Sequence, residues 1–447
     1  MKKVLKITAF LLFLIISYLV ILNQFPKDAG RFPFLVILFL SDYYLWKSFT
    51  QWLKNKRFFF RSIITLLYWL PLLLLAVLTV ARMASFELIA NESIIILLQG
   101  FIVSVYISKL IPVIFLLFSD LLKFIRFLIR KIHNLRRSEF EKRNGHPITR
   151  SKFLQQIGLA GGGLLFSGLL VGMFRWVHDF KVHHHRLKLP HLPNSFNRLR
   201  IVQISDLHLG SWTSADELEN AVTTINNLRP DLIFFTGDLV NYKTDEAFRY
   251  ENILSGLNAN YGVFTILGNH DYGDYSHWTS AQAKENNMTD LFELYRRIGW
   301  KLLNNNNAII EHIDGKIAII GVENWGNFTR FPQYGDIEKA KKNTESADVK
   351  ILLSHDPSHW EKIISIYHPD IDLTFSGHTH GFQFGVELKH FKWSPAQYAY
   401  KYWAGLYENL NAVSKKQYLY VNRGIGTIGY PGRVGILPEI TCFELYT

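Results

Sequence analysis

Five groups of Asp, Asn and His residues each follow a short apolar stretch between Leu199 and His380. The groups are Asp206 with His208, Asp238, Asn269 with His270 and Asp271, His355, and His378 with His380. Short apolar stretches bounded by polar turns are typical of buried strands, and ligands of open α/β sheets gather beyond the carboxyl ends of the strands. We therefore expect all five groups to meet in one pocket.

The residue types in these groups predict a metal site. Hard or borderline divalent cations bind carboxylate oxygen, amide oxygen and neutral imidazole. The expected ligands are Asp206, His208, Asp238, Asn269, His355, His378 and His380. A carboxylate shared by two ions would hold them roughly 3.5–4 Å apart, the spacing used in phosphoester displacement. Asp238, alone at its strand end behind Gly237, is the expected bridge.

Any one of these motifs is weak by itself, because an isolated Asp-x-His or Gly-Asp is common by chance, but their combination is specific. Together they resemble the signature of calcineurin-like metallophosphoesterases, carried by Asp206-x-His208, Gly237-Asp238, Gly268-Asn269-His270-Asp271, His355 and Gly377-His378-x-His380. The resemblance covers about residues 195–447 and is closest in layout to bacterial membrane-anchored members of that family.

The resemblance implies a four-layer α/β/β/α sandwich and two divalent ions, which would be manganese, iron or zinc. By the family pattern, the first ion is held by Asp206, His208, Asp238 and His380, and the second by Asp238, Asn269, His355 and His378. The expected reaction is hydrolysis of a phosphoester or pyrophosphate bond by metal-activated water.

His270 is not a metal ligand in that pattern. Because it lies between Asn269 and Asp271, we expect it to be the general acid that protonates the leaving oxygen, with Asp271 fixing its tautomer. The alternative is a core histidine satisfied by hydrogen bonds.

The first 176 residues carry the surplus of apolar residues in a chain that is 49% hydrophobic. Five segments approach the length of about 20 apolar residues that crosses a bilayer, near Ile7–Leu22, Phe34–Trp46, Ser62–Ala81, Ile94–Phe118 and Ile157–Met173. No small-residue cleavage site follows the first segment, so we expect it to be an uncleaved span. Asp42 and Lys109 fall inside apolar segments, where they could pair across helices or simply lie at helix contacts.

Basic residues set the expected orientation. Ten Lys and Arg residues against two Glu residues lie within 123–152, and the alternate loops 23–33 and 82–93 hold few basic residues. By the positive-inside rule, the basic loop is cytoplasmic and five spans place the carboxyl-terminal domain outside a bacterial cell membrane. This loop also contributes most of the net charge of +12, so the charge does not call for a nucleic-acid partner.

The domain prediction follows from these segments. We expect four spans in 1–122, a basic cytoplasmic loop at 123–153, a fifth span at 154–176, a linker at 177–195 and the metallophosphoesterase domain at 196–447. Three adjacent histidines, His183–His185, fall in the linker and are expected to be part of a solvated tether. Beyond it, strand-like and helix-like segments alternate, which predicts a largely parallel sheet covered by helices. One of the expected helices spans Glu246–Leu257.

The substrate is the least constrained part of the prediction. Residues 382–407 are rich in aromatic residues and lysine, which suits a bilayer interface, although a packed core loop would have the same composition. An interface would favour a membrane-proximal or lipid-linked phosphorylated substrate. Some relatives cleave the pyrophosphate of UDP-2,3-diacylglucosamine in lipid A synthesis, but that substrate is cytoplasmic and conflicts with the expected orientation. A non-catalytic sensor or transporter is a further alternative, disfavoured because no expected ligand is missing.

Overall fold

The computed structural model describes residues 2–26, 29–84, 91–133, 150–389, 391–410 and 415–447. The chain divides into two compact units, Met1–Leu170 and Val171–Thr447. Residues 134–149 of the predicted basic loop lie outside the described residues, whereas its flanks 123–133 and 150–153 are helical.

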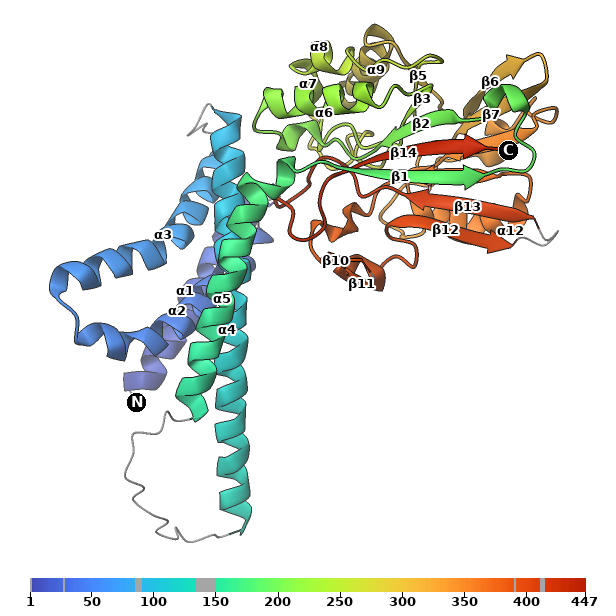
Figure 1. Cartoon of the computed structure of the whole chain (residues 1–447). Coiled ribbons are helices and arrows are strands. Elements are labelled where there is room, and N and C mark those ends of the chain that lie inside the picture. Colours follow the sequence, from blue (N-terminus) through green and yellow to red (C-terminus); the bar gives the residue numbers. More distant parts are fainter. Residues whose placement is uncertain (1, 27–28, 85–90, 134–149, 390, 411–414) are drawn as a thin grey trace. The chain divides into compact units, whose positions relative to one another are not determined.

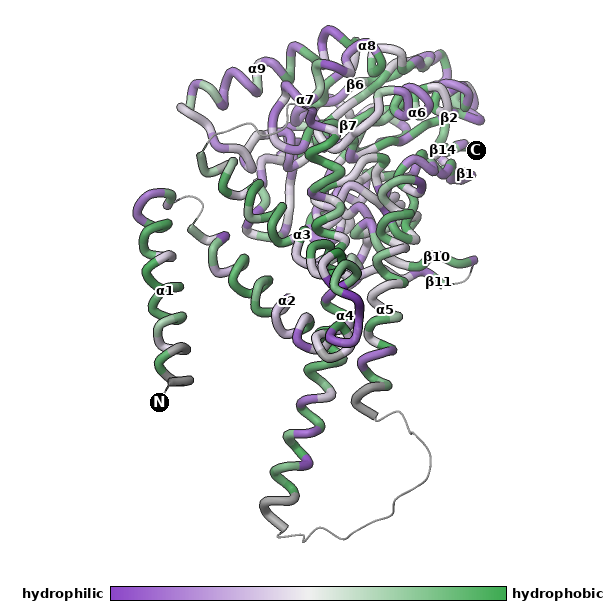
Figure 2. The backbone as a smooth tube through the Cα atoms, turned by 90° about the vertical axis from the view of Figure 1, so that its left-hand side faces the viewer, coloured by the Kyte–Doolittle hydropathy of each residue, from purple (hydrophilic) through white to green (hydrophobic). Residues whose placement is uncertain are grey.

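All the secondary-structure elements among the described residues of the amino-terminal unit are helices. Its helices are α1 (Lys2–Gln24), α2 (Arg31–Lys54), α3 (Phe58–Met83), α4 (Glu92–His133) and α5 (Arg150–Phe174), the last of which runs into the second unit. Figure 2 shows that apolar residues predominate along these helices. Three described segments are long and apolar enough to cross a membrane: Phe58–Ala81, Glu92–Ile129 and Phe153–His178. The predicted first and second segments are helices too, but their role as spans stays a prediction.

A buried ion pair links α2 to α4. Lys109 Nζ lies 2.6 Å from Asp42 Oδ1, and the Tyr106 hydroxyl donates to Asp42 Oδ2 at 2.9 Å. Asp42 is only 1% exposed, so the two charges compensate each other among apolar side chains. Of the two possibilities left by the sequence, the structure therefore shows pairing across helices.

Two six-stranded sheets and a small hairpin make up the carboxyl-terminal unit (Figure 1). The first sheet has the order β1 (Lys181–Lys188), β14 (Glu439–Tyr446), β2 (Leu199–Ile204), β3 (Leu232–Phe235), β4 (Val263–Thr265) and β5 (Trp300–Leu302). The second has the order β12 (Gly405–Leu410), β13 (Lys416–Val421), β9 (Leu373–Ser376), β8 (Val349–Leu353), β7 (Gly315–Gly321) and β6 (Asn306–His312). The hairpin pairs β10 (Val386–Leu388) with β11 (Phe391–Trp393).

Helices cover the outer face of each sheet. The first sheet is covered by α6 (Ala215–Asn227), α7 (Asp245–Phe248), α8 (Glu251–Leu254) and α9 (Ala281–Arg297). The second is covered by α10 (Ile337–Ala340) and by a helical segment made of α11 (Pro357–His359), a π turn (Trp360–Ile364) and α12 (Ser365–Tyr367).

The layers follow from the alternation of side chains along each strand. In β3, Leu232 and Phe234 pack into the core between the two sheets, whereas Ile233 and Phe235 pack under the helices. Successive side chains of a strand point to opposite faces, so a continuous apolar run is what a strand buried on both faces requires. The predicted four-layer α/β/β/α sandwich is confirmed.

Two expectations about elements are wrong. Residues 181–188 of the predicted linker form β1, which pairs in parallel with β14 along its whole length, so His183–His185 lie in a strand and not in a solvated tether. The single helix expected over Glu246–Leu257 is split into α7 and α8, because Tyr250, with φ −106° and ψ 2°, leaves the helical conformation.

Candidate metal centre

The five predicted groups lie at the carboxyl ends of five strands that belong to the two sheets. Asp206 and His208 follow β2, Asp238 follows β3, Asn269 and His270 follow β4, His355 follows β8, and His378 and His380 follow β9. The backbone turns sharply there: Asp206, His208, Asp238, His378 and His380 all have φ between 46° and 72°. Left-handed conformations of non-glycine residues are strained and cluster at functional sites.

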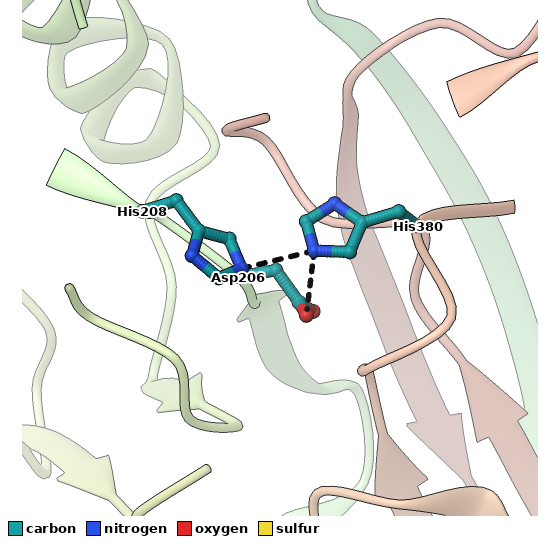
Figure 3. A group of neighbouring side chains, drawn as sticks. All are labelled: Asp206, His208 and His380. Carbon is teal, nitrogen blue, oxygen red and sulfur yellow. Dashed lines mark hydrogen bonds and ion pairs between the residues drawn. The ribbon is translucent and has the colours of Figure 1, made fainter. Parts of the chain in front are cut away.

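One group joins the loops after β2 and β9 (Figure 3). His380 Nε2 lies 3.2 Å from Asp206 Oδ1 and 3.0 Å from His208 Nε2. All three side chains are buried, at 0–6% exposure. Two imidazoles and a carboxylate that converge on one point can hold a divalent ion together.

A second group lies beside the first and contains Asp238, His355 and His378. His355 Nε2 is 3.1 Å from Asp238 Oδ2 and 3.2 Å from His378 Nδ1. The same Asp238 Oδ2 is 3.5 Å from Nε2 of His208, a member of the first group. A single carboxylate oxygen therefore lies within reach of the ligand atoms of both groups.

Asn269 provides an independent test of whether the pocket suits a metal. Its Nδ2 donates to the Tyr275 hydroxyl at 2.9 Å, whereas its Oδ1 is buried and has no hydrogen-bond partner among the described residues. A buried polar atom without a partner is costly, and binding of an ion is one ordinary way to satisfy it. Since the other donors are carboxylate and imidazole, the set fits two hard or borderline divalent cations.

Burial controls the protonation of most of these side chains. It lowers the pKa of His208 to about 3 and that of His378 to about 4, and holds the pKa of His380 well below its usual value. Neutral imidazoles keep the lone pair that a metal requires.

For His355 and Asp238, the contact between the two side chains, and not burial, decides the direction of the pKa shifts. Burial disfavours the charged forms of both residues, but their contact outweighs it, raising the pKa of His355 to about 10 and holding that of Asp238 well below its usual value. An ion that binds at His355 must therefore displace a proton.

The structure places His270 beside the two groups, with its ring 4.9 Å from that of His208. The prediction that Asp271 fixes its tautomer is wrong, because His270 Nδ1 contacts the backbone carbonyl of Asn241 at 2.7 Å. Asp271 instead accepts hydrogen bonds from the backbone N–H groups of Asp238 at 2.9 Å, Leu239 at 2.8 Å and Gly268 at 2.8 Å. It holds together the two loops that carry Asp238 and Asn269.

Three further residues touch the site and were not predicted from the sequence. The Tyr275 ring lies 4.4 Å from that of His270, tilted by 41°, and its hydroxyl accepts from Asn269, while the Tyr400 hydroxyl lies 2.7 Å from His378 Nε2. Arg433 is fully buried and donates to the carbonyls of Arg423, Gly424 and Gly426, which fixes the glycine-rich turn against Asp206. Tyr275 lies only six residues after Asn269, whereas Tyr400 and Arg433 lie outside the motifs, and none of the three has a characteristic spacing that identifies it as a site residue.

Comparison with known proteins agrees with the geometry. A family model described as "Calcineurin-like phosphoesterase" matches residues 199–382, and one described as "Probable Calcineurin-like phosphoesterase, transmembrane domain" matches residues 29–176. The chain is 31% identical to the uncharacterized metallophosphoesterase YkuE of Bacillus subtilis, over 67% of this chain and 98% of that protein.

Two further similar proteins come from other organisms. The transmembrane protein with metallophosphoesterase domain of Danio rerio is 29% identical, over 67% of each chain. The UDP-2,3-diacylglucosamine pyrophosphatase LpxG of Chlamydia muridarum is also 29% identical, over 53% of this chain and 81% of that protein.

Proposed function

We propose a dinuclear reaction centre for this chain, which belongs to the calcineurin-like phosphoesterase family and is a membrane-anchored metallophosphoesterase. Seven side chains would hold the two ions: Asp206, His208, Asp238 and His380 on one side, and Asp238, Asn269, His355 and His378 on the other. The observation that carries the proposal is the position of Asp238 Oδ2 between His208 and His355.

Two divalent ions, when bound, would lower the pKa of water near neutrality and neutralise charge on the phosphoryl oxygens. The chain supplies the remaining requirements. The ligand side chains are held by buried loops that need little reorganisation, which favours electrostatic stabilisation of the transition state. The deep burial of the ligands lowers the local dielectric and so strengthens the electrostatic interactions within the ligand cage.

His270 is the proposed general acid. Its Nδ1 contacts the Asn241 carbonyl, so Nδ1 carries a hydrogen and Nε2 is the nitrogen that gains and releases a proton. One ring nitrogen of His270 lies within 4.8 Å of ligand atoms of His208 and Asp238, close enough to serve the leaving oxygen of a bound ester.

For the substrate, we propose a phosphorylated or pyrophosphate-linked lipid. The membrane anchor supports this class, because a tethered domain meets membrane-embedded substrates at high effective concentration. The similarity to LpxG of Chlamydia muridarum makes a UDP-2,3-diacylglucosamine-type pyrophosphate the second candidate. The two candidates differ in the side of the membrane on which the domain would work.

A metal and activity assay on the full chain in lipid nanodiscs tests the reaction centre. Loaded with Mn²⁺, the chain should hydrolyse a nitrophenyl phosphate monoester or diester and contain two ions per chain by elemental analysis. Asp238→Ala should lose the ions and the activity, whereas Asp290→Ala, at an exposed position of α9, should keep both. Full activity in Asp238→Ala would contradict a metal centre in which the two ions share the Asp238 carboxylate.

A further inference from the structure

The β10–β11 hairpin turns its apolar side chains outward and its charged side chains toward the domain. Val386 pairs with Trp393 and Leu388 with Phe391, so these four apolar side chains share one face. Val386, Leu388 and Phe391 are 42–65% exposed. The polar pair between them, Glu387 and Lys392, takes the other face and bonds to the domain.

Polar contacts fix this inner face. Glu387 Oε1 accepts from Arg423 Nη2 at 2.7 Å, and Lys392 Nζ donates to the Ala404 carbonyl at 2.6 Å. A water-soluble surface would present the opposite arrangement, with apolar side chains inward and charges outward. The hairpin is therefore held so that its apolar side chains face away from the protein.

Two exposed aromatic residues next to the hairpin enlarge this surface. Phe382 precedes β10 and is 65% exposed, and Tyr398 follows β11 and is 77% exposed. Phe382 also has a left-handed backbone, with φ 56°, an unusual conformation for a bulky residue. We call Phe382, Val386, Leu388, Phe391 and Tyr398 the apolar hairpin surface.

The end of the last membrane-spanning segment packs beside this surface, within the same compact unit. The Gly172 carbonyl near the end of α5 accepts from Arg433 N at 3.2 Å, and a Cβ at Gly172 would lie 2.9 Å from Val434 Cγ2. Val434 in turn pairs with the base of the hairpin, since Gly385 N donates to its carbonyl at 2.9 Å. Val434 therefore lies against both the end of α5 and the base of the hairpin.

We propose that the apolar hairpin surface inserts into the bilayer interface where α5 leaves the membrane. A segment that crosses the bilayer and ends at Phe174 or soon after fixes the membrane surface at that point. Phe174 is itself 61% exposed, so it adds an exposed apolar side chain at this end of α5. The exposed Lys389 in the hairpin turn suits the phosphates of lipid headgroups.

Docking would place the metal centre close to lipid. Ser394 Oγ, just after β11, donates to the Gly381 carbonyl at 2.7 Å, and Thr379 Oγ1 donates to the Trp403 carbonyl at 2.6 Å. His378 and His380 lie in the loop held by these bonds. The consequence for substrate choice, a lipid-linked ester taken directly from the bilayer, rests on the proposed function, whereas docking itself does not.

Depth-dependent quenching tests the docking. Cys442 is the chain's only cysteine, so Leu388→Cys in a Cys442→Ala background can carry a single fluorophore on the full chain in nanodiscs of phosphatidylcholine and phosphatidylglycerol. The matched control is Ile313→Cys, in the exposed β6–β7 turn. We expect doxyl-labelled lipid to quench the label at 388 and aqueous iodide to quench the label at 313. Equal quenching of the two labels by doxyl lipid would overturn the proposal.

An activity measurement distinguishes docking from support of the metal loop. The double variant Leu388→Glu with Phe391→Glu should lose at least several-fold in kcat/KM toward a pyrophosphate-linked lipid in the nanodisc, and keep its kcat/KM toward soluble nitrophenyl phosphate, as should Ile313→Glu. Loss toward both substrates, or toward neither, would overturn the proposal. Lipid quenching at 388 in a chain that hydrolyses no ester would instead contradict only the proposed function.

Discussion

Backbone strain at single residues is the clearest sign that the pocket is built for binding. Five of the seven expected ligands adopt left-handed conformations, each of which costs about 1–2 kcal/mol for a residue with a Cβ. The surrounding sheets, whose cores are almost fully buried, supply the stability that offsets this strain. The strain would serve no purpose if the seven side chains merely filled space.

Variants of Asn269 and of its partner Tyr275 can distinguish metal binding by the Asn269 amide from its contact with Tyr275. Asn269→Ala removes the amide oxygen and should weaken Mn²⁺ binding by on the order of 100-fold, whereas Tyr275→Phe removes only the hydroxyl that orients the amide and should weaken it by about tenfold. Metal titration of the two variants measures the difference. Equal effects would mean that Asn269 acts through its contact with Tyr275 and not as a ligand.

His270→Ala should keep both ions and lose about 10²–10⁴-fold in rate with a poor leaving group. With a good leaving group such as nitrophenolate the loss should be small, because that oxygen needs no proton. A series of aryl phosphates of graded leaving-group pKa provides the measurement. An equal loss across the series would contradict the acid role.

Asp271→Asn should act differently from His270→Ala, because Asp271 holds backbone N–H groups and does not contact the His270 ring through any described hydrogen bond. An amide in place of the carboxylate turns one acceptor into a donor and should destabilise the domain by roughly 2–4 kcal/mol. Thermal unfolding would report this loss, and the leaving-group dependence of the rate should be unchanged. A change confined to that dependence would restore Asp271 as the partner of His270.

Among the elements, the glycine-rich turn before β14 is the one that fixes the position of Asp206. Gly426 N donates to the Asp206 carbonyl at 2.9 Å, and a Cβ at Gly426 would collide with the Leu207 carbonyl. Gly426→Ala should therefore displace Asp206 and lower the affinity for Mn²⁺. The control is Gly163→Ala in α5, where a Cβ meets nothing within 4 Å. Unchanged affinity in Gly426→Ala would show that the turn can shift without moving Asp206.

The elements also show where sequence reasoning succeeds. Strand segments buried on both faces, such as β3 and residues 351–353 of β8, are continuous apolar runs, and the ligands sit at their ends, so both the strands and the ligand positions were predictable. The edge strand β1 was not, because it pairs on one side only and reads Lys-Val-His-His-His-Arg-Leu-Lys, in which only Val182 and Leu187 are apolar. Tyr400 and Arg433 were missed because only the tertiary fold brings them to the site.

At the scale of the whole molecule, the side of the membrane on which the phosphoesterase domain lies determines which substrates it can reach. That side depends on the number of spans. Helices α3, α4 and α5 contain the segments that have the length and composition of a span, whereas the role of α1 and α2 as spans stays a prediction. Five spans, with the basic loop at 123–152 in the cytoplasm, put the phosphoesterase domain outside.

Reporter fusions to the full chain resolve the orientation and with it the substrate class. With five spans, alkaline phosphatase fused after Thr447 should be active, and a green fluorescent reporter there should be dark when exported unfolded; the same pair inserted in the basic loop should behave in the opposite way. The physical reason is the ten basic residues of that loop, which resist translocation. A fluorescent fusion after Thr447 would instead mean an even number of spans. The metal centre would then face the cytoplasm, where a UDP-linked diacylglucosamine is accessible and an exported phospholipid is not.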